Sequence, residues 1–264
     1  MSETSPVIAV NNLVAYYGSR CILNNIDFHV EPGEIRIIMG GSGSGKSTLL
    51  RHLLGLNRPT SGNVRLLGVD VGNASEQDLH ALRRQMGVAF QGGALFSSLS
   101  VGENIKLPLR EHTNLDEKTM DIMARIKLET VNLGGFQDLM PAQLSGGMVK
   151  RAAVARAIIM DPKLLFFDEP SAGLDPVVSA ELDDMILRLR EALKMTIVVV
   201  THELDSAFKI ADRITILDQG KVLMTGTVAE VQSSDNSRVQ DLLNRRPRQA
   251  EVNAEDYLRR LTEA

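Results

Sequence analysis

The sequence predicts an α/β fold in which helices cover a mainly parallel β-sheet. Short apolar runs alternate with helical patterns through most of the 264 residues, and strands that alternate with helices form a parallel sheet covered on both faces. Near the start of this alternation, a Gly/Ser-rich segment lies between an apolar strand and a helix. A chain of this length holds one large domain or two small ones, and it can bury a substantial core.

The expected strands fall into two groups. Four lie close together near the N-terminus and suggest a small mixed β layer around the glycine-rich loop. Strand patterns cover residues 7–14, 27–30, 34–39 and 63–67, and then 86–90, 164–168, 196–200, 213–217 and 221–225. Helical patterns cover residues 76–85, 116–131, 147–160, 177–193 and 203–211. Because residues 92–160 are almost all helical in pattern, we interpret them as an inserted helical subdomain.

The C-terminal region departs from this alternation. A short helical pattern (Val239, Leu242, Leu243) leads into a basic run at 245–248, where a proline should end the helix. A last amphipathic stripe begins near Asn253. Packing on its own domain and docking on a partner chain both remain open for this stripe.

Composition excludes several classes of protein. The net charge is −4 and 23% of residues are charged, whereas non-specific nucleic-acid binding needs a basic chain or patch. We therefore expect no nucleic-acid partner. The single cysteine, Cys21, excludes an internal disulfide framework and fits a reducing compartment. No apolar run is long enough for a membrane helix and no secretory signal is visible, so we expect a cytoplasmic location with any membrane-spanning part on another chain.

The glycine-rich segment matches the pattern G-x-x-x-x-G-K-[ST] at every fixed position. Its glycines let the backbone wrap an anion with N–H groups, the lysine reaches the terminal phosphates, and the hydroxyl of Ser47 can coordinate Mg²⁺. A plain surface loop is the alternative, but a strand precedes the segment and leucines at helical spacing follow it. The predicted nucleoside triphosphate site is the phosphate loop, which consists of Gly40, Gly41, Ser42, Gly43, Ser44, Gly45, Lys46, Ser47 and Thr48.

Two apolar strands end in residues suited to phosphate chemistry. Residues 164–168 lead into Asp168 and Glu169, of which the first can orient Mg²⁺ and the second can polarise an attacking water. Solvated acids at a strand end are the alternative, and the phosphate loop upstream favours the functional interpretation. His202 follows the strand at 196–200, where ligands gather in open α/β sheets, and can donate to a γ-phosphate.

A second small-residue segment, Leu-Ser-Gly-Gly-Met at 144–148, opens another helix and can bind an anion through backbone N–H groups and the hydroxyl of Ser145. We refer to it as the signature segment. One triphosphate would hardly need two such loops from one chain. An ordinary helix-entry turn is the alternative.

In this order the motifs resemble those of the nucleotide-binding subunits of ATP-binding cassette (ABC) transporters, across residues 7–232. The resemblance implies a P-loop NTPase fold with a RecA-like parallel sheet core, a small antiparallel β subdomain and a helical subdomain at about 92–160. It further implies an ABC ATPase domain over 1–235 and a C-terminal extension over 236–264. Two copies would sandwich two ATP molecules with Mg²⁺.

The resemblance also assigns roles to individual residues. Glu169 and His202 match the catalytic base and the switch histidine, and Tyr17 matches the aromatic that stacks on adenine. Gln91 matches the glutamine that touches Mg²⁺ and senses the membrane partner, so Ser47, Gln91 and Asp168 form the implied metal set. Residues of the signature segment (Ser145, Gly146, Gly147) match those that cap the nucleotide of the opposing subunit, and Asp175 belongs to the loop that crosses the dimer interface.

One departure from the family pattern is informative. The commonest signature ends in glutamine, whereas this chain has Met148. This variant, together with residues 91–104 and 107–112, is similar to the ATPases of the mammalian-cell-entry (MCE) and maintenance-of-lipid-asymmetry (Mla) systems. That similarity implies phospholipid cargo and a homodimer under a membrane permease, with an MCE-domain protein beyond the membrane.

Several points stay open within this resemblance. A small STAS-type protein binds the ATPase in some of these systems. The implied location is peripheral, on the cytoplasmic face of the inner (plasma) membrane, and by hypothesis the C-terminal extension grips the other ATPase copy. An importer of small polar solutes shares every catalytic motif and is the alternative. A soluble ABC ATPase that works on ribosomes or DNA normally carries two cassettes, whereas this chain has one. Glu169 and His202 argue against a regulatory module that binds nucleotide without hydrolysing it.

Overall fold

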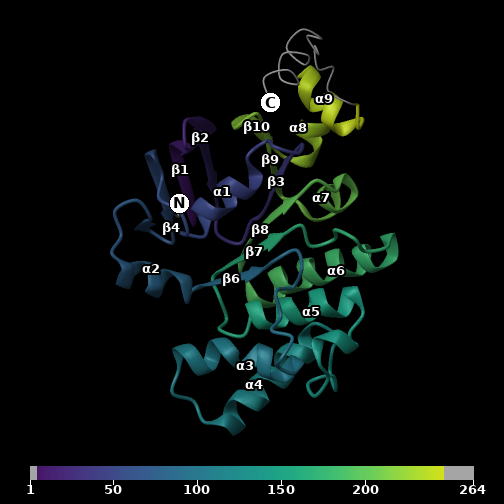
Figure 1. The fold of residues 1–264 in the computed structure, drawn as a ribbon. Coiled ribbons are helices and arrows are strands. Elements are labelled where there is room, and N and C mark those ends of the chain that lie inside the picture. The colour runs from purple at the N-terminus through teal and green to yellow at the C-terminus, as the bar shows by residue number, and fades with distance from the viewer. Residues whose placement is uncertain (1–4, 247–264) are drawn as a thin grey trace, which may run out of the picture.

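The structure is a computed structural model that describes residues 5–246, and it contains two β-sheets with helices around them (Figure 1). The smaller sheet has the strand order β2-β1-β4-β5, and all its neighbouring strands are antiparallel. Its strands are β1 (Ile8–Tyr17), β2 (Arg20–Val30), β4 (Ser61–Leu66) and β5 (Val69–Asp70).

The larger sheet has the order β10-β9-β3-β8-β7-β6, and its strands run parallel except for the antiparallel pair β9 and β10. Its strands are β3 (Ile35–Gly40), β6 (Met86–Ala89), β7 (Leu164–Asp168), β8 (Thr196–Thr201), β9 (Arg213–Asp218) and β10 (Lys221–Gly226). The predicted α/β fold with a parallel sheet core, a small antiparallel β subdomain and inserted helices is confirmed.

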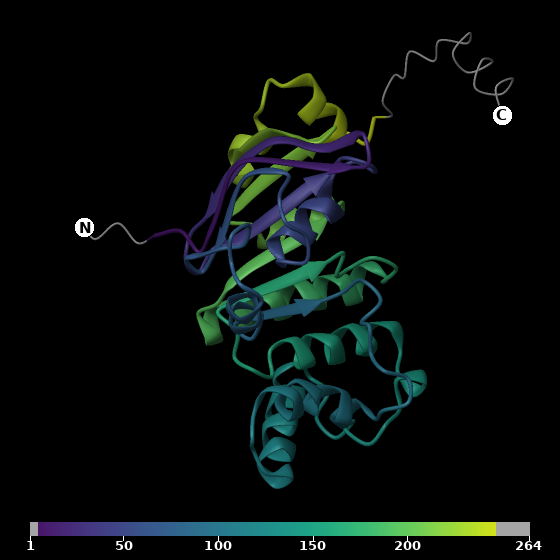
Figure 2. The same cartoon turned by 60° about the vertical axis from the view of Figure 1, so that its left-hand side comes forward.

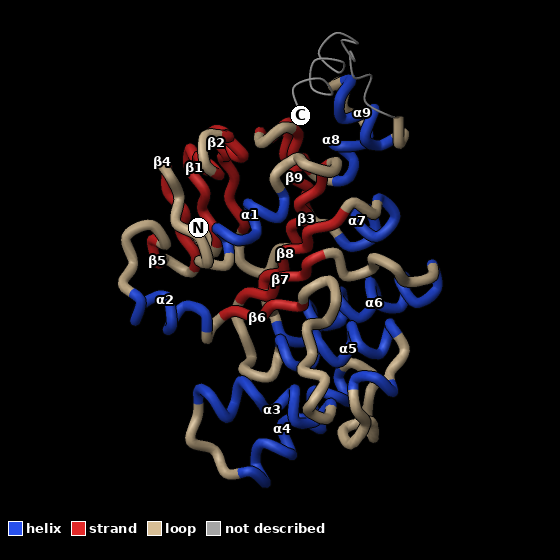
Figure 3. The backbone as a smooth tube through the Cα atoms, viewed as in Figure 1, coloured by secondary structure: helices blue, strands red, loops and turns tan. Residues whose placement is uncertain are grey.

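Helices surround this larger sheet, as the tube drawing shows (Figure 3). They are α1 (Lys46–Leu53), α2 (Glu76–Arg83), α3 (Val101–His112), α4 (Glu117–Thr130), α5 (Gly146–Ala157), α6 (Pro176–Leu193), α7 (Leu204–Ile210), α8 (Val228–Gln232) and α9 (Ser237–Leu243). Several begin at a polar cap: Ser75, Ser100 and Thr227 form capping boxes, and Asp116 and Asp175 accept from first-turn N–H groups.

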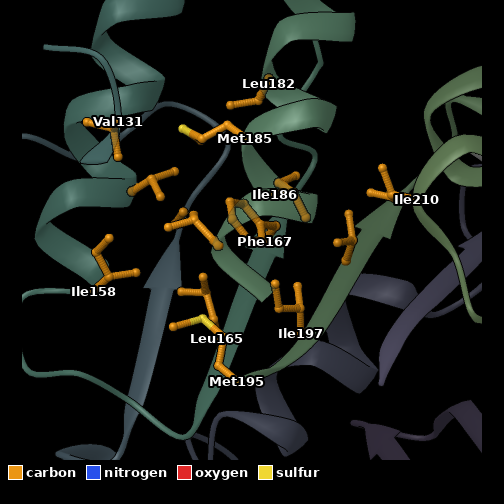
Figure 4. Packing of buried hydrophobic residues seen from close by; sticks show 14 of the residues in the cluster. Val131, Ile158, Leu165, Phe167, Leu182, Met185, Ile186, Met195, Ile197 and Ile210 are labelled. Carbon is orange, nitrogen blue, oxygen red and sulfur yellow. The ribbon is translucent and has the colours of Figure 1, made fainter. Parts of the chain in front are cut away.

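Successive side chains of the central strands pack into two separate cores. Ile35 and Ile37 of β3 belong to one cluster with α3 to α9, whereas Ile38 belongs to the other with α1, α2 and the small sheet. This division follows from the period of two in a strand, which sends successive side chains to opposite faces. Figure 4 shows the first cluster, where Leu165 and Phe167 of β7 pack among side chains that include Met185 and Ile186 of α6.

Helices α3, α4 and α5 lie at the end of the molecule opposite the small sheet (Figure 2). The expectation that residues 92–160 are almost all helical is too broad, because residues 91–100 before α3 and residues 131–145 between α4 and α5 contain no α-helix. Gly93 has a φ of 74°, and Pro141 begins a short 3₁₀ turn, so the backbone itself interrupts the helices there.

Two sequence-based expectations about the strands need correction. The segment 34–39 is not part of the small layer, which is purely antiparallel rather than mixed; it forms β3 at the centre of the larger sheet. All six residues of β3 are buried, as expected for a strand covered on both faces. Short β5 escaped prediction because it has only two residues, and the first half of β2 because two asparagines interrupt its pattern and Asn25 has a φ of 52°.

The start of the predicted C-terminal extension packs on the chain's own core. Val239 of α9 is fully buried, and Leu242 and Leu243 contact the larger cluster. The helix ends at Leu243, and Arg245 then has a φ of 51°. The stripe expected from Asn253 onward lies outside the described residues. Within residues 5–246, no helix is long and apolar enough to cross a bilayer.

A buried ion pair lies at the start of β3. Arg36 of β3 is 1% exposed, and its Nε donates to Glu34 Oε1 at 2.6 Å. The guanidinium also donates to Thr215 Oγ1 at 3.0 Å and lies 6.0 Å from the centroid of the Phe28 ring in β2. The second carboxylate oxygen of Glu34 accepts from the backbone N–H of Glu31 at 2.8 Å. Both charges are thus partnered in an environment that excludes water.

Removing one partner of this pair should destabilise the fold strongly. Arg36→Met leaves the Glu34 carboxylate buried without its cation, and we expect the free energy of unfolding to fall by about 3–5 kcal/mol in urea titrations. Glu34→Gln in the same chain should recover part of that loss. Arg58→Met is the control, because its pair with Glu76 is exposed and 3.9 Å long, which is worth less than about 1 kcal/mol. Equal effects of Arg36→Met and Arg58→Met would mean that burial adds nothing to the cost of breaking the pair.

Candidate functional site

The candidate site lies at the carboxyl edge of three neighbouring strands, β3, β8 and β7. The phosphate loop follows β3, Glu169 follows β7 and His202 follows β8. The register pairs Met39 with Thr201 and Asp168 with Val200, so the three strands end at the same edge. Residues that are far apart in the sequence therefore meet where ligands bind in open parallel sheets.

The phosphate loop is shaped by two glycines that admit no side chain. A Cβ at Gly40 would lie 2.3 Å from the carbonyl oxygen of Leu217, so this position must be glycine for β3 to continue into the loop. Gly45 precedes α1 with a φ of 107°, which is a region that favours glycine. The free N–H groups at the start of α1 are therefore aimed back into the loop, and they favour an anion.

The side chain of Lys46 folds back over the first residues of the phosphate loop. Its Nζ donates to the carbonyl oxygens of Gly40 at 2.7 Å and Gly41 at 3.1 Å. Burial lowers the pKa of the Lys46 amine, and the charges of Glu169 and Asp168 oppose that shift. Ser44 is also buried, and its Oγ has no hydrogen-bond partner in the described residues. The loop thus holds a cation and an unpaired hydroxyl.

Asp168 and Glu169 differ in their surroundings. Burial raises the pKa of Asp168, the charge of Glu169 raises it further, and Lys46 lowers it. The two acids at the end of β7 therefore interact electrostatically with Lys46 at the start of α1, although these segments are far apart in the sequence. Two neighbouring carboxylates and one ammonium form a polar cluster directly beside the phosphate loop.

Glu169 is held in an unusual backbone conformation. Its φ is 48°, in the left-handed region that few residues other than glycine adopt. Its N–H donates to the carbonyl oxygen of Val200 at 2.8 Å, and its side chain is 13% exposed. His202 Nδ1 lies 2.9 Å from Glu169 Oε2. The backbone N–H of His202 also donates to Glu169 Oε2, at 3.4 Å.

Other predicted residues lie around this centre. Gln91 is exposed after β6, the edge strand next to β7. Tyr17 ends β1, and its hydroxyl lies 3.4 Å from Arg51 Nη1 of α1 and 3.5 Å from Asn57 Nδ2. Tyr16 and Tyr17 are equally exposed, at 47% each, but these two contacts place the Tyr17 hydroxyl beside α1, the helix that follows the phosphate loop.

The signature segment lies apart from the phosphate loop of the same chain. Ser145 precedes α5, and its Oγ accepts from the Met148 N–H at 3.3 Å. Ser145 and Gly146 are exposed, and Ser145 and Gly147 line a hollow whose other walls include α6. Among the described residues, the lining of this hollow includes none of residues 40–48. Within this chain, the two anion-binding segments therefore do not form one site.

Asp175 acts here as a helix cap. Its carboxylate accepts from the N–H groups of Val177 and Val178 at 3.0 Å each. The neighbouring Val177 side chain is 69% exposed, which is high for an apolar residue. The loop before α6 is thus fixed in shape and presents an apolar side chain to the outside.

Sequence reasoning missed Lys150 of α5. Its Nζ donates to the carbonyl oxygen of Pro170 at 2.5 Å and to that of Glu169 at 3.2 Å. The only signal available was a lysine inside an alanine-rich helix just beyond the signature segment, and nothing in the sequence connected it to a strand nineteen residues away.

The chain resembles a known protein family and several individual proteins. Residues 23–172 match the family model described as ABC transporter. The chain is 40% identical over 260 residues to a Haemophilus influenzae protein called intermembrane phospholipid transport system ATP-binding protein MlaF, and the match covers 97% of this chain and 98% of that protein. It is 38% identical over 239 residues to the probable ribonucleotide transport ATP-binding protein mkl of Mycobacterium tuberculosis, covering 90% and 67%.

Solved structures also resemble the fold. The ATP-binding cassette MJ0796, described as a dimer in a post-hydrolysis state bound to ADP and Pi, superposes with a TM-score of 0.76 and 30% identity. That match covers 84% of this chain and 98% of the solved chain.

Neutralising Asp168 should stabilise the protein at neutral pH. Because the native pKa of Asp168 is raised above its ordinary value of 3.8, the folded state holds the proton more tightly than the unfolded chain. Ionising Asp168 therefore costs more free energy in the folded state than in the unfolded chain. This cost is absent at low pH, when the carboxyl is protonated in both states, and it is fully present above the native pKa. Asp168→Asn should therefore raise the urea midpoint at pH 7, and the gain should shrink as the pH falls toward 3.8.

The exposed Asp235 provides the control for this experiment. Asp235→Asn also removes one negative charge, but it should leave the urea midpoint nearly unchanged at both pH values. A loss of stability in Asp168→Asn at pH 7, or a gain that does not depend on pH, would contradict the electrostatic account.

Proposed function

Because the chain belongs to the ABC transporter family, we propose that it is the ATP-hydrolysing subunit of a membrane transporter that moves phospholipid. One observation carries the ATPase half of this proposal. At a single sheet edge, the phosphate loop meets Glu169, whose carboxylate lies 2.9 Å from His202 Nδ1. Phosphoryl transfer to water requires groups that bind the phosphate chain and a carboxylate that can act on the attacking water.

Nucleotide binding is assigned to the phosphate loop. Its backbone N–H groups and the N-terminus of α1 would surround the β- and γ-phosphates. The Lys46 amine, which now donates to Gly40 and Gly41, would exchange these carbonyl oxygens for phosphate oxygens. Tyr17 would stack on the adenine, as its place beside α1 allows.

Hydrolysis is assigned to Glu169 and His202. Glu169 would orient a water molecule toward the γ-phosphorus and accept its proton as the bond to the ADP oxygen breaks. His202 would donate a hydrogen bond to the γ-phosphate. In the conformation described, its Nδ1 lies 2.9 Å from Glu169 Oε2 and its Nε2 lies 3.4 Å from Glu203 Oε1. Binding of the γ-phosphate to His202 would therefore rearrange at least one of these contacts.

The residues expected to hold Mg²⁺ suit that ion. Ser47, Gln91 and Asp168 offer a hydroxyl, an amide and a carboxylate, which are the oxygen ligands that Mg²⁺ prefers, with phosphate oxygens and water completing the shell. No group of three or more His, Cys, Asp or Glu residues that could hold a metal ion occurs between residues 5 and 246. When bound, Mg²⁺ would neutralise charge on the phosphates.

A second copy of the chain is the proposed partner at the nucleotide. Ser145 and Gly147 lie apart from residues 40–48 of their own chain, so an opposing copy could bring its signature segment over the nucleotide. The loop ending in Asp175 would lie across the interface, where the exposed Val177 could be covered. The dimeric state of MJ0796 supports this arrangement.

The membrane partners and the cargo are proposed from the relatives. The 40% identity to an intermembrane phospholipid transport protein over nearly the whole chain supports phospholipid cargo, as does Met148 in the signature segment. The partners would be a membrane permease and an MCE-domain protein, with a STAS-type protein as a further candidate. The chain would work at the cytoplasmic face of the inner membrane as a peripheral subunit.

A second cargo has specific support. The Mycobacterium tuberculosis relative is called a probable ribonucleotide transport protein, so the ATPase of an importer for small polar solutes is the alternative. The chain spans 67% of that relative and 98% of the Haemophilus influenzae protein. The fuller match favours phospholipid.

Replacing the proposed base should separate binding from hydrolysis. In Glu169→Gln, the loss of a proton acceptor should lower the turnover number for ATP by roughly 10²–10⁴-fold, whereas the dissociation constant for ATP should change little. Steady-state phosphate release and equilibrium binding measure the two quantities. Glu191→Gln, at an exposed position of α6, should keep full turnover. Unchanged hydrolysis in Glu169→Gln would exclude the proposed mechanism.

The cargo can be tested in the assembled transporter. We expect an affinity-tagged chain to isolate a permease, an MCE-domain protein and bound phospholipid from detergent-solubilised membranes. In vesicles reconstituted with that complex, fluorescent phospholipid should move in an ATP-dependent way that Glu169→Gln abolishes. ATP-dependent uptake of a ribonucleotide without lipid movement would favour the alternative.

A further inference from the structure

Lys150 makes a contact that none of the roles above uses. Its amine donates to two consecutive carbonyl oxygens, those of Glu169 and Pro170, at 3.2 and 2.5 Å. The Lys150 side chain is half-buried. Burial lowers the pKa of its amine and the Glu169 carboxylate raises it, so the charge of Lys150 acts on the carboxylate as well as on the carbonyl groups.

These carbonyl groups belong to the turn that aims the Glu169 side chain. The Glu169 carbonyl oxygen also accepts from the N–H of Ala172 at 3.3 Å, which closes the turn. On the other side, the N–H of Glu169 is fixed to Val200 at 2.8 Å. A residue with a φ of 48° is disfavoured by sterics and persists only when its surroundings hold it. Lys150 supplies the side-chain part of that support.

The helix that carries Lys150 is itself firmly anchored. Ala152 to Ala155 of α5 are buried in the larger core, and Arg151 Nη2 donates to Glu181 Oε2 of α6 at 2.6 Å. Lys150 therefore extends from a firmly packed helix, and its amine can hold the strained turn at Glu169 in place. Ser145 caps the N-terminus of the same helix, so α5 joins the signature segment to the turn that follows β7.

We propose that Lys150 is a positioning residue for ATP hydrolysis, which holds the backbone of Glu169 so that the carboxylate faces the attacking water. The inference rests on the proposed role of Glu169 as the base. Lys150 does not touch the phosphate loop, and it acts on the chemical step through Glu169. Loss of Lys150 should therefore reduce turnover without weakening the grip on ATP.

The first test separates turnover from binding in the full chain. Lys150→Met should lower the turnover number on the order of ten- to a hundredfold, as expected when a catalytic group is displaced by about 1 Å. The dissociation constant for ATP should stay within about twofold. Lys150→Arg should restore most of the turnover, because a guanidinium can also donate to two carbonyl oxygens.

Lys209→Met is the matched control. Lys209 also donates its amine to a backbone carbonyl, that of Ala180 at 2.9 Å, but it pairs with Asp184 and has no contact with Glu169. The turnover number of Lys209→Met should match that of the unchanged protein. Melting temperatures of all variants identify any loss that comes from unfolding, and a turnover loss in Lys150→Met that follows only the unfolded fraction would overturn the proposal.

The second test uses ATP-driven dimerisation to separate Glu169 from the signature segment. Glu169→Gln should accumulate an ATP-bound dimer, since hydrolysis is blocked. Because Lys150 acts through the base, Lys150→Met in the same chain should leave that dimer intact at the same ATP concentration. Loss of the dimer would mean that Lys150 supports the binding of the opposing nucleotide by the signature segment, and this result would overturn the proposal. Full turnover in Glu169→Gln itself would instead overturn the proposed function, so the two failures are distinguishable.

Discussion

The parallel register of β3, β8 and β7 is the constraint on which the rest of the molecule depends. Met39 lies opposite Thr201, and Asp168 lies opposite Val200, so three strands from distant parts of the chain end at one edge. Each of the following loops then begins beside the others. A slip of one residue in this register would exchange the two faces of a strand and bury the wrong side chains. The two apolar cores on either side of the sheet therefore fix the site as well as the fold.

The same edge gathers groups that are unfavourable for folding. Asp168 is partly buried beside Glu169, Lys46 is desolvated, and Glu169 has a left-handed backbone. Contacts from several directions offset these costs. The N–H of Glu169 is bound by Val200 and its carbonyl group by Lys150. At the start of β3, the pair of Arg36 and Glu34 is a further buried charge pair, and the Arg36 guanidinium also lies over the ring of Phe28 in the small sheet.

The sequence predicts best where one physical signal dominates. Residues 164–167 and 197–200 are continuous apolar runs, and both are buried in central strands. The phosphate loop is predictable because its glycines and lysine have fixed spacing. The assignment of residues 34–39 to the small layer is wrong because a short apolar strand carries no information about its neighbours. The interpretation of residues 92–160 as almost all helical is too broad, because it gives too little weight to the glycine and proline signals at 91–100 and 131–145. Lys150 could not be foreseen, since its contact depends on how α5 packs beside the end of β7.

The left-handed backbone at Glu169 also has a consequence for protein engineering. A non-glycine residue in this region carries roughly 1–2 kcal/mol of steric cost, and glycine would relieve it. Stability-guided redesign of this chain would thus select Glu169 for replacement, although the site chemistry is assigned to its carboxylate. Any automated search for a hardier version of this ATPase should hold position 169 fixed and seek its gains elsewhere.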